Sequence, residues 1–151
     1  MRFGAVLLDL DGCLIDSNDA HSRAWSRALR AFGLRVRPSA IRIHFGKGGA
    51  ELLRDFLPPA AHHFVSDALG ATETRLFLAR FSREVRPLPG AAGTVREMRR
   101  AGIPVVLASS ADRKVGDRSL ARLRAGRSGS AFPCSAETAA RSSSPRDPRS
   151  S

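Results

Sequence analysis

The sequence predicts an α/β fold with a parallel-sheet core and an insertion of helices. The first observation is an apolar run from Ala5 to Leu8, which is typical of a strand buried on both faces, as in a parallel sheet. The second observation is a similar run from Ile103 to Ala108. The third is that only helical patterns lie between these runs, so the two strands are expected to be joined by a crossover connection and to run parallel.

Two carboxylates lie at the carboxyl end of the first predicted strand. Asp9 and Asp11 are separated by one residue, so their side chains point the same way if the extended chain continues. In open α/β sheets, ligands bind at the carboxyl ends of the strands. Two close carboxylates raise each other's pKa, which suits either a divalent cation or a division of roles between nucleophile and acid/base.

Other interpretations of this Asp-Leu-Asp-Gly string explain less. A calcium loop needs further oxygen ligands at alternating positions, whereas Cys13, Leu14 and Ile15 follow here. Asp-Gly also occurs in turns, and one of residues 17–19 is expected to cap the next helix. Neither interpretation explains Asp9, because an unpaired charge beside an apolar run is costly.

Helical patterns fill the chain between the two strands. Apolar residues recur at helical spacing, as in Trp25 and Leu29. We expect residues 18–85 to form an inserted helical cap, with residues 1–17 and 86–115 forming the core. The predicted helices span residues 20–32, a short stretch around 52–57, and residues 60–70, 71–85 and 91–100.

Hydroxyl side chains follow the second predicted strand. Ser109 and Ser110 come directly after Ala108, at the sheet edge where the two carboxylates are expected. A hydroxyl at a strand end can bond a phosphate oxygen together with backbone N–H groups. Serine is common in turns, so the inference depends on the position of these serines relative to the first strand.

Taken together, the two strand ends resemble a known family. The segment from Leu7 to Ser17 (LLDLDGCLIDS) resembles motif I of the haloacid dehalogenase superfamily, in the subgroup of phosphoglycolate phosphatase-like and β-phosphoglucomutase-like hydrolases. The segment from Leu107 to Ala111 (LASSA) resembles motif II. The resemblance covers residues 3–115. It implies a Rossmannoid core with a small helical cap, and Mg²⁺-dependent phosphoryl transfer from a small phosphorylated metabolite through an aspartyl-phosphate.

The resemblance also implies roles for single residues. Asp9 matches the nucleophile and Asp11 the general acid/base, and both are expected to bind Mg²⁺. Ser109 matches the phosphate-binding residue, and Ser110 lies beside it. Lys47, in a Gly-Lys-Gly-Gly loop, falls in the part of the cap that faces the active site in this subgroup, so we expect it to contact substrate; a solvated loop lysine is the alternative.

The four histidines have no evident partner in the sequence. His62 and His63 are adjacent, so they lie on different sides of a helix, and no acid at helical spacing completes a metal site. His21 and His44 are likewise unpartnered. We therefore expect none of the four to serve as a catalytic base.

The pattern changes after Val115. A continuing core would supply a third buried strand, a motif III lysine and a motif IV acidic pair, but Arg, Ser, Ala, Gly and Pro dominate residues 116–151. We expect this tail to be disordered beyond a short helix near residues 120–123. Truncation of the family pattern by a shifted reading frame in a GC-rich gene explains the change, and a genuine basic tail is the alternative.

Charge and hydropathy limit the expected partners. The net charge is +11, but the arginines are scattered along the chain and no tyrosine is present to stack on bases, so we predict no specific nucleic-acid partner. No apolar run approaches the roughly 18 residues of a membrane span, and no signal-peptide pattern begins the chain. We therefore predict a cytoplasmic protein without a membrane partner.

Three functions remain after this reasoning. The first is a magnesium-dependent phosphomonoester hydrolase, which the family resemblance favours. The second is a catalytically inactive fragment of such an enzyme, because the later motifs are missing. The third is a basic, non-enzymatic nucleic-acid-binding protein, whose salt-sensitive binding would survive loss of both aspartates. The sequence distinguishes neither phosphatase from phosphomutase nor the oligomeric state.

Overall fold

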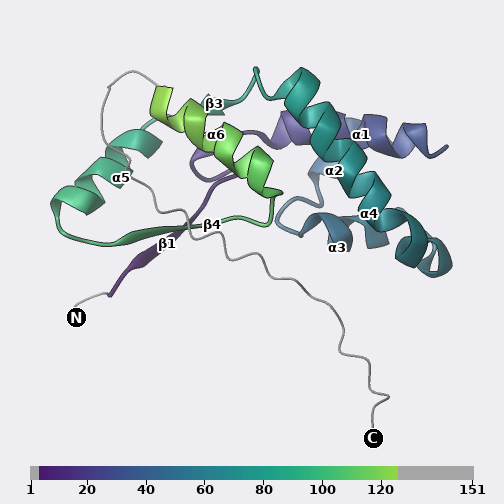
Figure 1. Ribbon diagram of the computed structural model, residues 1–151, viewed down its shortest axis with the longest axis horizontal. Coiled ribbons are helices and arrows are strands. Elements are labelled where there is room, and N and C mark those ends of the chain that lie inside the picture. The colour runs from purple at the N-terminus through teal and green to yellow at the C-terminus, as the bar shows by residue number, and fades with distance from the viewer. Residues whose placement is uncertain (1–3, 126–151) are drawn as a thin grey trace, which may run out of the picture.

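The computed structural model describes residues 4–125 and contains a parallel pair of strands. Strand β1 (Val6–Asp9) pairs with β4 (Val105–Ala108), and Asp9 lies opposite Ala108. The carboxyl ends of the two strands therefore meet at one edge (Figure 1). The predicted parallel pairing is confirmed.

Helices pack on one face of this strand pair. In Figure 1, α1 to α4 lie together on one side of the molecule, α5 lies on the other side, and α6 lies between them, above the strands. The helices are α1 (Asn18–Ala31), α2 (Pro38–Arg42), α3 (Gly49–Arg54), α4 (Pro59–Leu76), the π-helical turn η1 (Phe77–Phe81), α5 (Ala91–Arg100) and α6 (Arg113–Ala125). The predicted α/β class with inserted helices is confirmed.

A second, short strand pair lies where the chain leaves the strands and returns to them. Strand β2 (Ile15–Asp16) pairs antiparallel with β3 (Arg86–Pro87). The N–H of Leu88 donates to the carbonyl oxygen of Leu14 at 2.9 Å and extends this pairing. The pair joins both ends of the helical insertion. Strands of two residues carry no periodic pattern, so sequence reasoning did not predict them.

Buried apolar side chains form two clusters. The strand cluster packs β1 and β4 against α5 and α6, and the helix cluster lies among α1 to α4. The strand cluster contains Leu10, Leu14, Ile15, Ala20, Ala24, Phe77, Phe81, Val85, Ala91, Val95, Val115, Leu120 and Leu123. The helix cluster contains Trp25, Ala28, Leu29, Ile41, Leu52, Leu53, Leu57 and Leu69. Because α1 contributes to both clusters, it connects the inserted helices to the strands.

One face of the strand pair is exposed, and the prediction that both faces are buried is wrong. Leu7 is 68% exposed and its register partner Val106 is 40% exposed. Leu8 and Leu107, on the opposite face, pack against the strand cluster. An apolar run indicates that a strand is suited to burial, but it does not indicate how many of its faces another element covers.

Helix α4 is continuous where the sequence predicted two helices, over residues 60–70 and 71–85. Gly70, the expected break, lies inside α4 and has no positive φ. Leu69 is fully buried in the helix cluster, and α4 packs along α1. This packing outweighs the low helix propensity of a single glycine, about 1 kcal/mol relative to alanine.

Helix α6 continues past residue 115, where the core was expected to end. The short helix expected near residues 120–123 is present as part of α6, which begins at Arg113. Val115, Leu120 and Leu123 are buried in the strand cluster. The expected boundary therefore falls inside a packed helix. The remaining tail, for which disorder was predicted, lies outside the described residues.

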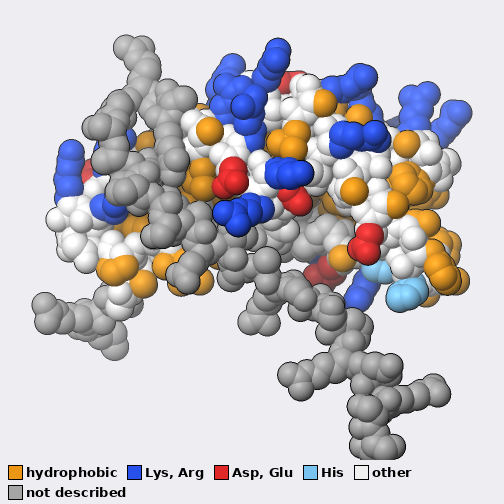
Figure 2. Space-filling model, in the orientation of Figure 1, with side chains coloured by type: hydrophobic (Ala, Val, Ile, Leu, Met, Phe, Trp, Pro, Cys, Tyr) orange, Lys and Arg blue, Asp and Glu red, His pale blue; other side chains and the backbone are white. Residues whose placement is uncertain are grey.

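Basic side chains are spread over the surface. Figure 2 shows Lys and Arg side chains in several groups over the helices, with acidic side chains between them. Some of them form ion pairs, as Arg23 does with Glu84 and Arg42 with Asp19. Within residues 4–125, no helix is both long enough and apolar enough to cross a membrane.

Truncation of Leu10, directly after β1, should affect stability more than truncation of Leu7, on the exposed face of β1. Leu10 is only 2% exposed, so Leu10→Ala should lower the free energy of unfolding by about 2–5 kcal/mol. Leu7→Ala should change it by no more than about 0.5 kcal/mol, because that side chain is already in solvent. Urea denaturation measures both values. Equal losses would show that the outer face of the strands is covered.

Candidate active site

Most of the expected site residues line a single cavity. Its volume is about 1040 Å³, and it lies between the carboxyl ends of β1 and β4 and the inserted helices. Asp9, Asp11, Lys47 and Ser110 are on its wall. Ser109 reaches this group through a hydrogen bond to Asp11. The cavity is at the upper end of the range for small-molecule sites, roughly 300–1,000 Å³.

Asp9 is the last residue of β1 and has one carboxylate oxygen available. Its Oδ1 accepts a hydrogen bond from the N–H of Leu10 at 2.8 Å. Within the described part of the chain, no donor bonds Oδ2. Partial burial raises the pKa of Asp9 above its ordinary value; the Leu10 hydrogen bond opposes this shift and the negative charge of Asp11 adds to it. A carboxylate oxygen facing a cavity is a suitable nucleophile or cation ligand.

Asp11 is surrounded by donors. The Ser17 hydroxyl donates to Asp11 Oδ1 at 2.6 Å, and the Ser109 hydroxyl donates weakly to Oδ2 at 3.5 Å. Burial alone raises the pKa of Asp11, but the neighbouring His21 and the two serine hydroxyls stabilise its ionised form and lower the pKa below its usual value. Asp9 and Asp11 therefore have pKa values displaced in opposite directions.

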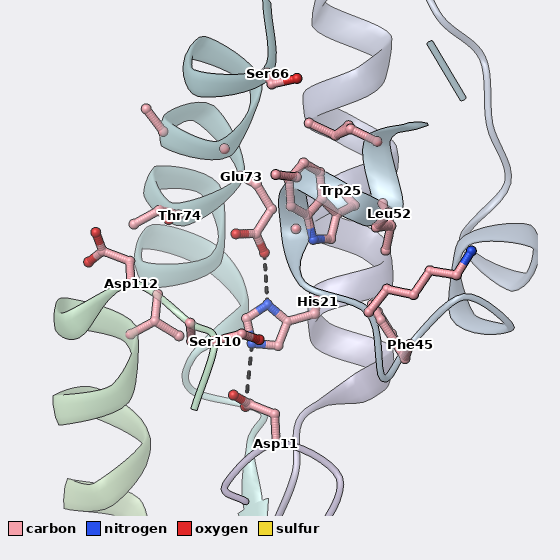
Figure 3. A pocket seen from close by; sticks show the side chains of 18 of the residues that line it. Asp11, His21, Trp25, Phe45, Leu52, Ser66, Glu73, Thr74, Ser110 and Asp112 are labelled. Carbon is pink, nitrogen blue, oxygen red and sulfur yellow. Dashed lines mark hydrogen bonds and ion pairs between the residues drawn. The ribbon is translucent and has the colours of Figure 1, made fainter. Parts of the chain in front are cut away.

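His21 lies between two carboxylates, as Figure 3 shows. Its Nδ1 is 2.8 Å from Oε1 of Glu73 on α4, and its Nε2 is 3.5 Å from Oδ1 of Asp11. Glu73 is only 5% exposed. The imidazole ring stacks on Phe77, with 3.9 Å between the ring centroids and 5° between the planes. The residue thus connects the end of β1 to both α1 and α4.

The charges around His21 determine its protonation. Burial lowers the pKa of an imidazole, but the hydrogen bonds and charges of Asp11 and Glu73 outweigh it and raise the pKa of His21 to about 9. At neutral pH the ring is therefore an imidazolium, with donors at both nitrogens. It offsets part of the negative charge that two nearby carboxylates bring to the cavity wall.

His21 and His44, for which the sequence shows no partner, both lie beside carboxylates in the structure. Glu73 is 52 residues from His21 along the chain, so no local spacing indicates the pair. One signal was present: His21 precedes Trp25 by four residues and shares its buried helical face, where a polar side chain needs a partner. His44 Nδ1 lies 2.7 Å from Asp55 Oδ2.

The loop after β4 places the expected phosphate-binding serines beside Asp11. The Ser109 hydroxyl accepts a hydrogen bond from the N–H of Ala111 at 3.2 Å, in addition to its weak bond to Asp11. Ser110 lies on the cavity wall. The side chain of Asp112 accepts a hydrogen bond from the N–H of Lys114 at 2.8 Å, within the first turn of α6. These bonds hold the loop in a compact turn at the strand edge.

Lys47 is both on the cavity wall and in an ion pair. Its Nζ lies 2.6 Å from Asp55 Oδ2. The hydrogen bond from Lys47, supported by the nearby His44, lowers the pKa of Asp55 below its usual value. The ammonium is therefore held near the cavity by a carboxylate from the end of α3.

The donor set limits the kind of metal site that this cavity can form. Within residues 4–125, no group of three or more His, Cys, Asp or Glu side chains is arranged to hold a metal ion. Mg²⁺ is usually bound through one or two carboxylates, waters and substrate phosphate rather than by a complete protein cage. A carboxylate pair such as Asp9 and Asp11 is compatible with a site of that kind.

Comparisons with known proteins agree with this description. A family model described as haloacid dehalogenase-like hydrolase matches residues 3–146. Hexitol phosphatase A of Escherichia coli strain K12 is 35% identical over 116 residues, which are 73% of this chain and 50% of that protein. The validoxylamine A 7'-phosphate phosphatase of Streptomyces hygroscopicus subsp. limoneus is 25% identical over 123 residues, 82% and 57% of the two chains. The chain thus spans about half the length of these curated relatives.

A solved structure supports the fold. A hydrolase from Pseudomonas syringae superimposes with a TM-score of 0.69 at 21% identity, over 79% of this chain and 54% of that chain. Similarity at this level of identity shows the fold alone. The family model, in contrast, matches most of the sequence. The chain therefore belongs to the haloacid dehalogenase-like hydrolases.

Proposed function

We propose that this chain carries the nucleophile and the acid/base of a magnesium-dependent phosphomonoester hydrolase that acts on a small phosphorylated metabolite. The observation that carries the proposal is the pair Asp9 and Asp11, which lie at the carboxyl end of β1 and share one cavity with Lys47 and Ser110. Their pKa values are displaced in opposite directions, but the lowered value belongs to Asp11, so the family resemblance, not the pKa values, assigns the nucleophile to Asp9 and the acid/base to Asp11. Membership of the family and the two related phosphatases support the proposal.

In the proposed reaction, Asp9 attacks phosphorus and the phosphoryl group moves onto its carboxylate, while the leaving oxygen accepts a proton from Asp11. Water then attacks the aspartyl-phosphate with Asp11 as the base. Asp11 is ionised before substrate binds, so it must first acquire a proton. His21 Nε2, at 3.5 Å from Asp11 Oδ1, is a protonated neighbour.

Asp9 and Asp11 are the residues that would hold Mg²⁺, which when bound offsets the negative charge of the carboxylates and the phosphate. We assign Ser109 and Ser110 to the phosphate oxygens. The bond from the Ser109 hydroxyl to Asp11 is long, at 3.5 Å, so exchanging it for a phosphate oxygen costs little. Lys47 is assigned to the substrate side of the cavity, opposite the strand ends.

Replacing the nucleophile should abolish turnover. Asp9→Asn should lower phosphate release from a general phosphomonoester, assayed with Mg²⁺, by on the order of 10³-fold or more, because an amide is a far poorer nucleophile. Asp16→Asn, an exposed carboxylate in β2 outside the cavity, should keep the parental rate. Undiminished turnover in Asp9→Asn would remove Asp9 from this role. If the parent chain showed no turnover, the inactive-fragment alternative would be favoured.

Loss of the cavity lysine should act on binding. Lys47→Ala should raise KM by about tenfold, as expected for one lost charge-assisted contact. Its melting temperature should change little, because exposed ion pairs contribute little to stability. Arg54→Ala removes a nearby cation that is not on the cavity wall and serves as the control. A large fall in melting temperature with unchanged KM would contradict this assignment.

The protonation of His21 should make stability depend on pH. Its folded-state pKa of about 9 lies above the ordinary value of 6.5, so its contribution is complete below pH 6.5 and is lost as the pH rises through 9. Urea denaturation between pH 6 and 10 should show this decline, at most about 1.4 kcal/mol per pH unit. His21→Gln should be less stable at pH 7 and lack the decline, whereas His62→Gln should retain it. A parental profile that is flat over this range would refute the assignment.

A further inference from the structure

The wall that α4 contributes to the cavity differs from the rest of that helix. It is polar and carries small side chains, whereas the other side of α4 places Val65, Leu69 and Leu76 in or against the helix cluster. The α4 residues on the wall are Ser66, Asp67, Gly70, Ala71, Glu73, Thr74 and Arg75. Ser66, Gly70 and Thr74 follow one another at intervals of four residues, so they lie on one face of the helix.

Gly70 lies at the middle of this wall. A glycine inside a helix lowers stability relative to alanine, and its φ is not positive. A Cβ built on Gly70 meets no atom within 4 Å. Neither the backbone conformation nor close packing therefore requires glycine at this position. The space beside Gly70 belongs to the cavity.

Three polar side chains lie near Gly70 on the same wall. Asp67, Thr74 and Arg75 form no side-chain hydrogen bond or ion pair with any described residue of the chain, whereas Glu73 is bound to His21. Asp67 and Arg75 are eight residues apart, which corresponds to about 12 Å along a helix. The wall therefore offers an acceptor, a hydroxyl and a guanidinium donor over a length of several carbon atoms.

We propose that the α4 wall selects an extended, polyhydroxylated leaving group. Gly70 provides the room for its carbon chain, and Asp67, Thr74 and Arg75 bind its hydroxyl groups. The inference rests on the proposed function, because the phosphate end of the ester would lie at Asp9 and Asp11 in the same cavity. A two-carbon ester such as phosphoglycolate is too short to contact all three side chains.

Binding to the full chain tests the inference without requiring turnover. Calorimetry on an Asp9→Asn background, with Mg²⁺ present, would give Kd values for a hexitol 6-phosphate, 2-phosphoglycolate and inorganic phosphate. Adding Gly70→Leu should raise the Kd of the hexitol 6-phosphate by about tenfold or more. It should leave the Kd of inorganic phosphate unchanged. Thr74→Val should raise the Kd of the hexitol 6-phosphate by a smaller factor and leave the Kd of inorganic phosphate unchanged.

Two variants separate this effect from an effect on folding. Ala68→Leu adds the same bulk at an exposed position of α4 that is not on the cavity wall, so the Kd of the hexitol 6-phosphate should not change. Gly70→Ala should raise the melting temperature, because alanine is favoured inside a helix. A lower melting temperature for Gly70→Ala would mean that folding requires the glycine. The proposal that Gly70 provides room for the leaving group would then be overturned.

Other outcomes distinguish the inference from the proposed function. If Gly70→Leu weakened the binding of inorganic phosphate and of hexitol 6-phosphate equally, selection by the α4 wall would be overturned. The proposed function would remain intact. Failure to bind the hexitol 6-phosphate, or tighter binding of 2-phosphoglycolate, would also overturn it. Conversely, a chain that shows no turnover but binds hexitol 6-phosphate in a Gly70-dependent way would support the inference and count against the proposed function alone.

Discussion

The imidazolium of His21 between Asp11 and Glu73 is the interaction on which the site depends. These residues come from the turn after β1, from α1 and from α4, and Phe77, fully buried in the strand cluster, stacks on the ring. Removing the central charge would leave two carboxylates facing each other in a poorly solvated space, which is strongly unfavourable. The position of the inserted helices over the strand ends is therefore coupled to the charge state of the cavity wall.

Asp9 and Asp11 carry the same side chain, and their surroundings make their pKa values differ. Asp11 receives hydrogen bonds from Ser17 and Ser109 and faces His21, so the start of α1 and the loop after β4 both stabilise its charge. Asp9 has the single bond from Leu10 and lies partly buried beside a like charge. An Asp-x-Asp string contains none of this information, and only the resemblance to a family assigned the two roles from the sequence.

What could be predicted from the sequence was local or followed from strand pairing. Apolar runs that stop at Asp9 and before Ser109 are local features, and parallel pairing of their strands necessarily brings both ends to one edge. The pairing of His21 with Glu73 depends on how α1 packs on α4, across 52 residues of sequence. For the same reason, the exposure of Leu7 was not predictable: it depends on which elements cover the strands.

The error at Gly70 has a different origin and is more informative. Helix propensity correctly identifies Gly70 as an unfavourable residue, and the helix forms there because Leu69 and its neighbours pack against α1. Packing explains why the helix survives the glycine, but it does not explain why glycine is present, because a Cβ there would contact nothing. Local disagreements between a sequence and its fold tend to occur at functional positions. Gly70 lies on the cavity that also contains Asp9 and Asp11, so the cost in stability is best understood as space reserved for a ligand.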